Sequence, residues 1–307
     1  GKENKSVLLL TYTKTLEHYL SLMLNSEKDI SNITIGRLYK TYYNRLTYND
    51  SLKKYDHIII DEAQDVQSEI HVYFNSISSN VTFGADDGQI LFPEKATNEE
   101  SLRKIYGEKK HLSEHCLSRN YRSTKQIMNT VRCFYPNEPI SPEAMMNSIA
   151  GDRPEVIIVD RDEIPNVITL IKTKADLSTT NIGILLPSKS MVETYYNELK
   201  EVFSSHLTKY ASDNEEFDKL GRIHITTYKS SKGLEWDMVI IPRFGSREWF
   251  EENTGIVDAD HYVAMTRAKS RLYLLSTDYS DKTTYDSFIK QNITPINLPE
   301  AGDDLPF

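Results

Sequence analysis

Short runs of apolar, mostly β-branched residues alternate with amphipathic stretches along nearly the whole chain, and this alternation limits the possible folds more than any other feature. The expected strands are residues 6–11, 55–60, 81–84, 156–159, 182–186, 223–227, 238–241 and 271–275. The expected helices are residues 16–24, 123–133, 164–174, 191–202 and 258–268. Nearly continuous apolar strands separated by helices are typical of parallel sheets that helices cover on both faces. Because the cycle runs twice, we expect an α/β protein with two domains that join near residues 117–125.

The composition of the 307 residues allows a substantial core, because 39% of them are hydrophobic and 26% are charged. A net charge of −9 excludes a polybasic coat, although binding to nucleic acid requires only a local basic groove. Two cysteines, Cys116 and Cys133, are too few for a disulfide framework or a four-cysteine zinc site, so we expect a cytoplasmic protein. The longest apolar runs have the length of strands, and we expect no membrane partner.

Acidic residues directly follow the expected strand 55–60, in the segment Asp61-Glu62-Ala63-Gln64-Asp65. In open parallel sheets, ligands bind beyond the carboxyl ends of the strands. At such a position Asp61 can hold Mg²⁺ through water, and Glu62 can polarise an attacking water for phosphoryl transfer. The alternative is the start of a helix, which Asp61 caps while Glu62 faces the helix dipole.

Three other polar segments suit the handling of phosphate and nucleic acid. Residues 84–89 are able to sense a γ-phosphate, although a Gly/Asp-rich turn explains them equally well. Arg122 and Arg267 offer the planar, permanent charge that suits a transferred phosphoryl group, whereas most arginines form surface ion pairs. Residues 225–237 carry hydroxyls, lysines and a glycine, which suit a nucleic-acid backbone or a plain polar connector.

Together these segments resemble, in the same chain order, the motif set of the superfamily 1 helicases of the UvrD/Rep type. The matching segments are residues 10–13 for the first strand-contacting motif, 61–65 for Walker B, 85–89 for the sensor motif, 120–123 for the fourth motif, 227–235 for the fifth and 263–268 for the sixth. The resemblance spans roughly residues 6–276.

The resemblance implies two RecA-like domains of the P-loop NTPase type, which use ATP and Mg²⁺ to move along single-stranded nucleic acid. We expect the first domain over residues 1–118, the second over residues 119–295 and an acidic tail over residues 296–307. The implied activity is that of an ATP-dependent helicase or translocase that acts on single-stranded DNA in the 3′ to 5′ direction, with RNA as the alternative substrate.

The resemblance also implies roles for single residues at the nucleotide. Asp61 would hold Mg²⁺ and the nucleotide, and Glu62 would be the catalytic base. The γ-phosphate sensor and the two arginine fingers would be Gln89, Arg122 and Arg267. The other nucleotide contacts would be Tyr121 at the adenine, Glu235 at the ribose, and Gly233. The implied nucleic-acid contacts are Thr11, Tyr12, Thr34, Phe92, Thr227 and Lys229.

The chain departs from the family most clearly in the phosphate loop, because G-x-x-x-x-G-K-[ST] occurs nowhere in the 307 residues. The family places this loop before the strand that begins here at Ser6, so we expect a first domain truncated at its N-terminus. A natural pseudoenzyme is the alternative. Ala85 stands at a usual glycine, Lys229 stands at the usual histidine of the fifth motif, and the segment around Phe92 lacks the family's continuation.

Two other classes of protein remain open from the sequence. The first is a non-hydrolysing, helicase-like module that binds or regulates nucleic acid. The second is a different P-loop enzyme, such as a signalling ATPase, which the strand-contacting motifs disfavour. The end of the chain, residues 299–307, resembles the acidic tip of bacterial single-strand-binding proteins, whose terminal Phe docks on partners. A protein partner for this tail and a plain solvated tail are both open.

Overall fold

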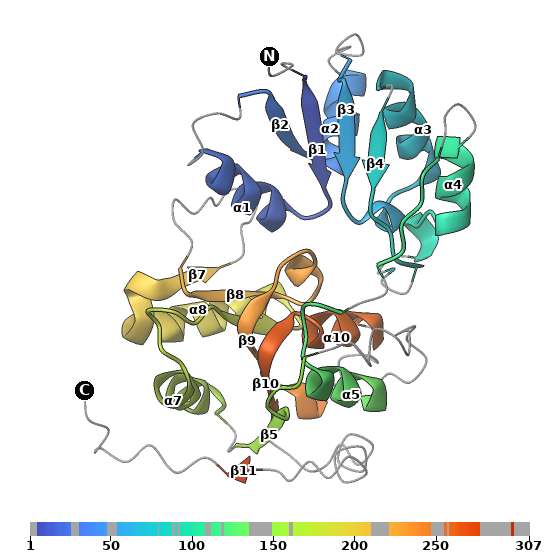
Figure 1. Cartoon of the computed structure of the whole chain (residues 1–307). Helices are drawn as coiled ribbons and strands as arrows, with labels where there is room; N and C mark the ends of the chain where they lie inside the picture. The colour runs from blue at the N-terminus through green and yellow to red at the C-terminus, as the bar shows by residue number, and fades with distance from the viewer. Residues whose placement is uncertain are drawn as a thin grey trace. The chain divides into compact units, whose positions relative to one another are not determined.

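The computed structural model describes residues 5–25, 31–47, 54–78, 80–87, 90, 93–107, 112–117, 120–134, 149–159, 162–209, 221–246, 255–256, 258–276 and 296–297. These residues form two compact units, and the boundary between them falls after Cys116 (Figure 1). We call the part up to Cys116 unit 1 and the described part from Leu117 onward unit 2, and each is treated by itself.

Unit 1 contains a parallel four-stranded sheet with the strand order β2-β1-β3-β4. Its strands are β1 (Val7–Thr11), β2 (Ile33–Arg37), β3 (His57–Ile60) and β4 (Val81–Phe83). The two central strands supply the middle of the core, because Leu8 and Leu10 on β1 and Ile58 and Ile60 on β3 are almost fully buried. Because all four strands run in one direction, their carboxyl ends lie along a single edge of the sheet.

Helices cover this first sheet and close its core. They are α1 (Lys14–Asn25), α2 (Leu38–Thr47), α3 (Ser68–Ile77) and α4 (Glu99–Gly107), with short 3₁₀ turns at Ala63–Asp65 and Pro93–Lys95. The helices bury Leu38, Phe74 and Leu102 completely against the strands. The sequence does not predict α2, α3 or α4, whereas it predicts α1 over residues 16–24.

Unit 2 contains a parallel seven-stranded sheet with the order β11-β5-β10-β9-β6-β8-β7. Its strands are β5 (Glu155–Ile158), β6 (Ile182–Leu186), β7 (Leu207–Lys209), β8 (Ile223–Thr227), β9 (Trp236–Ile241), β10 (Ala268–Ser276) and β11 (Ile296–Asn297). Every residue of β6 and of β8 is buried, as continuous apolar runs between two helical layers require.

Two of the helices of unit 2 begin at recognisable signals. They are α5 (Lys125–Phe134), α7 (Ile164–Lys174), α8 (Lys189–Phe203) and α10 (Asp258–Met265), with 3₁₀ turns at Ser204–His206, Lys229–Ser231 and Phe244–Ser246. The α7 helix has Pro165 in its first turn, where no backbone donor is lost. At the start of α8 the Ser188 hydroxyl accepts the Met191 N–H at 3.3 Å and so caps the helix.

The structure confirms the predicted fold class, since both units are parallel sheets flanked by helices. One predicted element is wrong at its end: the helix expected over residues 258–268 stops at Met265. There the Thr266 hydroxyl donates to the Val263 carbonyl at 3.0 Å, and the Arg267 N–H bonds back only three residues, to Ala264. This tight turn sends the chain into β10, so Arg267 lies beyond the helix. None of the described helices is long and apolar enough to cross a membrane.

Candidate functional site

The carboxyl edge of the unit 1 sheet gathers the ends of β1, β3 and β4. The Asp61 N–H donates to the Leu10 carbonyl at 3.0 Å, and the Gly84 N–H donates to the Ile60 carbonyl at 3.0 Å. These bonds continue the sheet register for one residue beyond each strand. As a result, Tyr12, Asp61 and Gly84 come together at one edge, although they lie far apart in the sequence.

A buried glutamine joins the two loops that follow β3 and β4. The Gln64 side-chain amide donates to the Glu62 carboxylate at 2.8 Å, and its carbonyl oxygen accepts the Asp86 N–H at 3.2 Å. Gln64 itself is completely buried. Glu62 has a φ of 54°, a left-handed conformation that costs energy for a residue with a side chain. Gln64 therefore holds a strained Glu62 in place and connects it to the loop that follows β4.

Asp61 suits an oxygen-binding cation. The residue is exposed at the end of β3 and lies close to Gly84, because a Cβ on Gly84 would be 3.9 Å from the Asp61 Oδ1, in ordinary van der Waals contact. Within the described residues, no cluster of three or more metal-ligating side chains exists. Mg²⁺ is commonly held by one or two carboxylates, waters and substrate phosphates, so this donor set fits that ion when phosphates supply the rest.

His71 on α3 forms hydrogen bonds that hold the loop after β3 in place. Its Nε2 lies 2.9 Å from the Ala63 carbonyl and its Nδ1 lies 2.9 Å from the Tyr106 hydroxyl. A carbonyl only accepts hydrogen bonds, so Nε2 carries the proton and Nδ1 accepts from Tyr106. His71 is completely buried, and this burial lowers its pKa to about 4. A neutral imidazole thus fixes the backbone immediately after Glu62.

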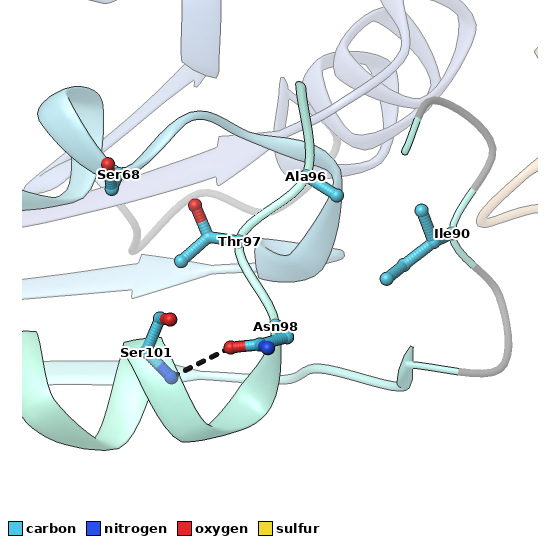
Figure 2. Close-up of a pocket in the computed structure, with 6 residues that line it drawn as sticks. All are labelled: Ser68, Ile90, Ala96, Thr97, Asn98 and Ser101. Atoms are coloured by element: carbon cyan, nitrogen blue, oxygen red, sulfur yellow. Dashed lines mark hydrogen bonds between the residues drawn. The ribbon is translucent and has the colours of Figure 1, made fainter. Parts of the chain in front are cut away.

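A pocket of about 310 Å³ lies beside this loop (Figure 2). Its lining residues come from the starts of α3 and α4 and from the segment between β4 and α4: Ser68, Ile90, Ala96, Thr97, Asn98 and Ser101. Thr97 ties the pocket wall to the loop after β3, because its N–H donates to the Gln64 carbonyl at 3.0 Å and its hydroxyl to the Val66 carbonyl at 2.5 Å. This pocket was not predicted, because its lining residues belong to none of the predicted motifs.

The strand-contacting residues predicted in unit 1 do not all meet. Thr11 is fully buried at the end of β1, and its hydroxyl donates to the Thr13 carbonyl at 3.3 Å. Tyr12 follows it and packs edge-on against Tyr39, with the ring centroids 6.3 Å apart. Thr34 is exposed but pairs with Leu8 near the start of β2, several residues from the carboxyl edge. Gln89 and Phe92 lie outside the described residues.

In unit 2, the fourth and sixth motifs are held together by short polar contacts. The Asn120 side-chain oxygen accepts the N–H groups of Arg122 at 2.9 Å and Ser123 at 3.1 Å, which forms a tight turn. The Ser123 hydroxyl then donates to the Ala268 carbonyl at 2.7 Å. Tyr121 lies at this turn with 76% of its surface exposed, so one face of its ring is accessible to a planar ligand.

Arg122 and Glu235 form an ion pair between two predicted nucleotide contacts that are 113 positions apart. The Arg122 Nε lies 2.9 Å from a Glu235 carboxylate oxygen, and Lys269 Nζ lies 3.8 Å from the other oxygen. Gly233, two residues before Glu235, has a φ of 81°, a conformation that glycine adopts at low cost. The structure thus brings Arg122, Gly233 and Glu235 into one local group.

Arg267 occupies a different environment from the exposed Arg122. Only 1% of the residue is exposed. Its guanidinium donates to the carbonyls of Val263 at 3.0 Å and Leu234 at 3.5 Å. In this arrangement the group braces the turn between α10 and β10, and its predicted role as an arginine finger remains a prediction.

The fifth motif forms contacts within its own turn and with α10. The Thr227 hydroxyl accepts the Ser230 N–H at 3.2 Å, which stabilises the turn after β8. Lys229 Nζ lies 3.8 Å from the carboxylate of Asp260, a fully buried residue of α10. The lysine at the family's usual histidine position is therefore paired with an acid that the sequence did not single out. The motif comparison missed His71 and Asp260, and it included Gln64 in the Walker B segment without a role.

Comparison with known protein families identifies part of unit 2. Residues 188–279 match the model of the UvrD-like helicase C-terminal domain. This match confirms the resemblance to UvrD-type helicases that the motifs predicted. A protein of Acanthamoeba polyphaga mimivirus with the provisional name ATP-dependent DNA helicase R568 is 26% identical over 249 residues. The aligned region covers 71% of this chain and 34% of that relative, so the chain spans about a third of the relative's length.

One solved structure, that of Dbp5, shows the same fold at low sequence identity. Dbp5 of S. cerevisiae, in a structure with RNA and ADP–BeF₃, is 14% identical with a TM-score of 0.54, over 97% of this chain and 79% of that one. The C-terminal domain of a candidate DNA helicase from Lactobacillus plantarum is 21% identical with a TM-score of 0.39, over 51% of this chain and 87% of that one. The Dbp5 likeness supports RecA-like α/β architecture and nothing about substrate.

Proposed function

We propose that this chain is the core of an ATP-dependent motor that moves along single-stranded nucleic acid, as a helicase or translocase of the UvrD type. The observation that carries the proposal is the arrangement of Asp61 and Glu62 beyond β3, where Gln64 locks Glu62 to the loop after β4. A side-chain cap by Glu62 does not explain this geometry, because Glu62 stands at the cap position of the following 3₁₀ turn in a left-handed conformation and makes no side-chain cap bond.

The residues of unit 1 would hold and use the nucleotide. Asp61 would hold Mg²⁺, which would neutralise charge on the phosphates when bound. Glu62 would accept a proton from the attacking water, and its fixed position favours this role because general bases act at hydrogen-bond distance. Gln89 would sense the γ-phosphate. The phosphate loop would have to come from outside these 307 residues, because the sequence contains no such motif.

The residues of unit 2 would contact the nucleotide from their own surface. Tyr121 is exposed enough to stack on the adenine, and Glu235 would bind the ribose. Arg122 would stabilise charge on the transferred phosphoryl group and would first have to leave Glu235. Arg267 would need to turn away from the carbonyls that it now binds.

Single-stranded DNA is the proposed substrate, with movement from 3′ to 5′ as in the resembling family, and RNA is the alternative. Thr11, Tyr12, Thr34, Phe92, Thr227 and Lys229 remain the proposed strand contacts. We also propose that the acidic C-terminal tail docks on a protein partner, and that the protein works in the cytoplasm.

The direct test is the ATPase activity of the complete protein with and without single-stranded DNA. We expect Glu62→Gln to lower the rate of ATP turnover by several orders of magnitude, because the general base is lost. ATP should still bind, because the charge at the phosphates is little changed. Glu100→Gln is the matched control, since Glu100 is a surface acid of α4 that forms an exposed ion pair with Lys104. Turnover of Glu62→Gln within a few-fold of wild type would refute the assignment.

A second function, that of a non-hydrolysing nucleic-acid-binding or regulatory module, is favoured by one observation, the absence of a phosphate-loop motif from the sequence. It predicts salt-sensitive binding of single strands without ATP turnover in the complete protein. A complete protein that hydrolyses ATP in a DNA-stimulated manner contradicts this second function.

A further inference from the structure

Tyrosine rings gather around α2 in unit 1, at the same edge of the sheet as Tyr12. The chain is rich in this residue, with 19 tyrosines among 307 residues. Tyr39 contacts Tyr12 edge-on, with the ring centroids 6.3 Å apart. Tyr42 contacts Tyr73 on α3 edge-on, with the ring centroids 5.3 Å apart. The cluster is therefore continuous from the end of β1 across α2 to α3.

Two of these rings, Tyr39 and Tyr43, lie nearly parallel to each other. Their planes differ by only 15°, and their centroids are 6.5 Å apart. Their separation of four positions on one helix places both side chains on the same helical face.

Exposure distinguishes Tyr43 from the other rings. Tyr43 is 55% exposed, whereas Tyr12, Tyr39, Tyr42 and Tyr73 are partly buried against the hydrophobic core of unit 1. The hydroxyl of Tyr39 is buried and has no hydrogen-bond partner among the described residues. The cluster thus presents an accessible aromatic face on Tyr43 and a rigid, half-buried ring on Tyr39.

The charges around the two rings favour a neutral base over a phosphate next to Tyr39, the more buried of the two. Burial is the main cause that raises the pKa of Tyr39, and the carboxylates of Asp65, Glu69 and Glu94 raise it further. On the helix itself, residues 38–47 include no acid, and Lys40 is exposed next to Tyr39 and three positions before Tyr43. A strand that places a base on the rings would therefore have cationic charge available for its phosphates on the outer side.

From this geometry we infer that Tyr39 and Tyr43 form a base-stacking site for single-stranded nucleic acid, which extends the strand path beyond Tyr12. The inference rests on the proposed function, because it assigns further contacts for the same substrate. Stacking on aromatic rings is tolerant of sequence, since every base has a π-face. The site would therefore hold the strand without selecting a sequence, as a protein that moves along a strand requires.

The test is the affinity of the chain for a fluorescein-labelled oligothymidylate, measured by fluorescence anisotropy at low salt. Tyr43→Leu keeps the apolar bulk but removes the flat ring, and we expect it to weaken binding by roughly 5- to 150-fold. Tyr43→Phe keeps the ring, and we expect an affinity within about twofold of wild type. Tyr196→Leu is the matched control, because Tyr196 is a tyrosine of α8 that lies next to Lys200 and Lys209 and is not one of the proposed strand contacts.

An abasic strand of the same length separates stacking from charge. On that strand we expect wild type and Tyr43→Leu to bind equally, because no base is present to stack. If wild type binds oligothymidylate and Tyr43→Leu binds it equally well, the stacking site is wrong and the exposed ring has another role, such as contact with a protein. If wild type binds no single strand even at low salt, the proposed function itself fails.

Discussion

Protonation of His71 should destabilise unit 1 below neutral pH, and the size of the effect follows from the structure. Burial lowers the pKa of His71 from 6.5 to about 4, so between these values the unfolded chain binds a proton that the folded unit excludes. The resulting stability is fully present above pH 6.5 and is lost as the pH falls toward about 4. At pH 5 the loss amounts to about 2 kcal/mol from this single group.

The matched variant is His71→Gln, which does not titrate and retains an amide donor that is able to reach the Ala63 carbonyl. We expect the variant to be less stable than wild type at pH 7, because it loses the fit to Tyr106. The difference in unfolding free energy between the two proteins should be about 2 kcal/mol smaller at pH 5, because only wild type loses stability through the titration of His71. Other titrating groups cancel in the difference between the two proteins.

Amide hydrogen exchange of Ile58–Ile60, corrected for the intrinsic rate at each pH, reports the opening free energy of unit 1. Tryptophan fluorescence reports unit 2 separately, because the chain has no tryptophan before Trp236. Unit 2 should show the same pH dependence in both proteins, including the part that comes from buried His224, whose pKa burial lowers to about 4. If the difference in the opening free energy of unit 1 between wild type and His71→Gln is the same at pH 7 and pH 5, the reasoning is refuted.

Replacement of either Arg122 or Arg267 by Lys in the complete protein should lower kcat by about 10³-fold or more, because lysine lacks the planar donor fork, while the affinity for ATP should change little. Steady-state ATPase kinetics measure both quantities. A change in ATP affinity alone would assign that arginine to ground-state binding. Gly183→Ala should destabilise unit 2 by about 1–3 kcal/mol, since the added Cβ would lie 2.6 Å from ring atoms of buried Trp236. Urea unfolding followed by tryptophan fluorescence measures this loss, and an unchanged midpoint would contradict it.

The parts of the fold that the sequence predicts best are those with long, continuous apolar runs. The bounds of β6, β8 and α7 agree with the predicted ranges 182–186, 223–227 and 164–174, because fully buried strands, and a helix whose buried apolar residues recur at helical spacing, leave a clear pattern. The edge strand β2 was not predicted, because Gly36 interrupts its pattern and most of its residues are only partly buried. Its strand conformation depends on pairing with β1.

The candidate site shows the same division between local pattern and distant contact. Asp61 and Glu62 stand out because they directly follow an apolar run. Gln64 and His71 do not, because their roles depend on Asp86 and Tyr106, which lie 22 and 35 positions further along the chain. The pairing of Lys229 with Asp260 likewise appears only when the 3₁₀ turn Lys229–Ser231 and α10 come together in space.

The most direct test of the central proposal is the ATP-driven displacement of streptavidin from biotinylated single-stranded DNA by the complete protein. A motor that moves from 3′ to 5′ should speed the release of streptavidin from a 5′ biotin, should leave a 3′ biotin undisturbed, and should fail when Glu62 is replaced by Gln. Release from the 3′ end alone would reverse the proposed direction. Firm binding of the strand without ATP-dependent release from either end would contradict a motor and would support the non-hydrolysing module.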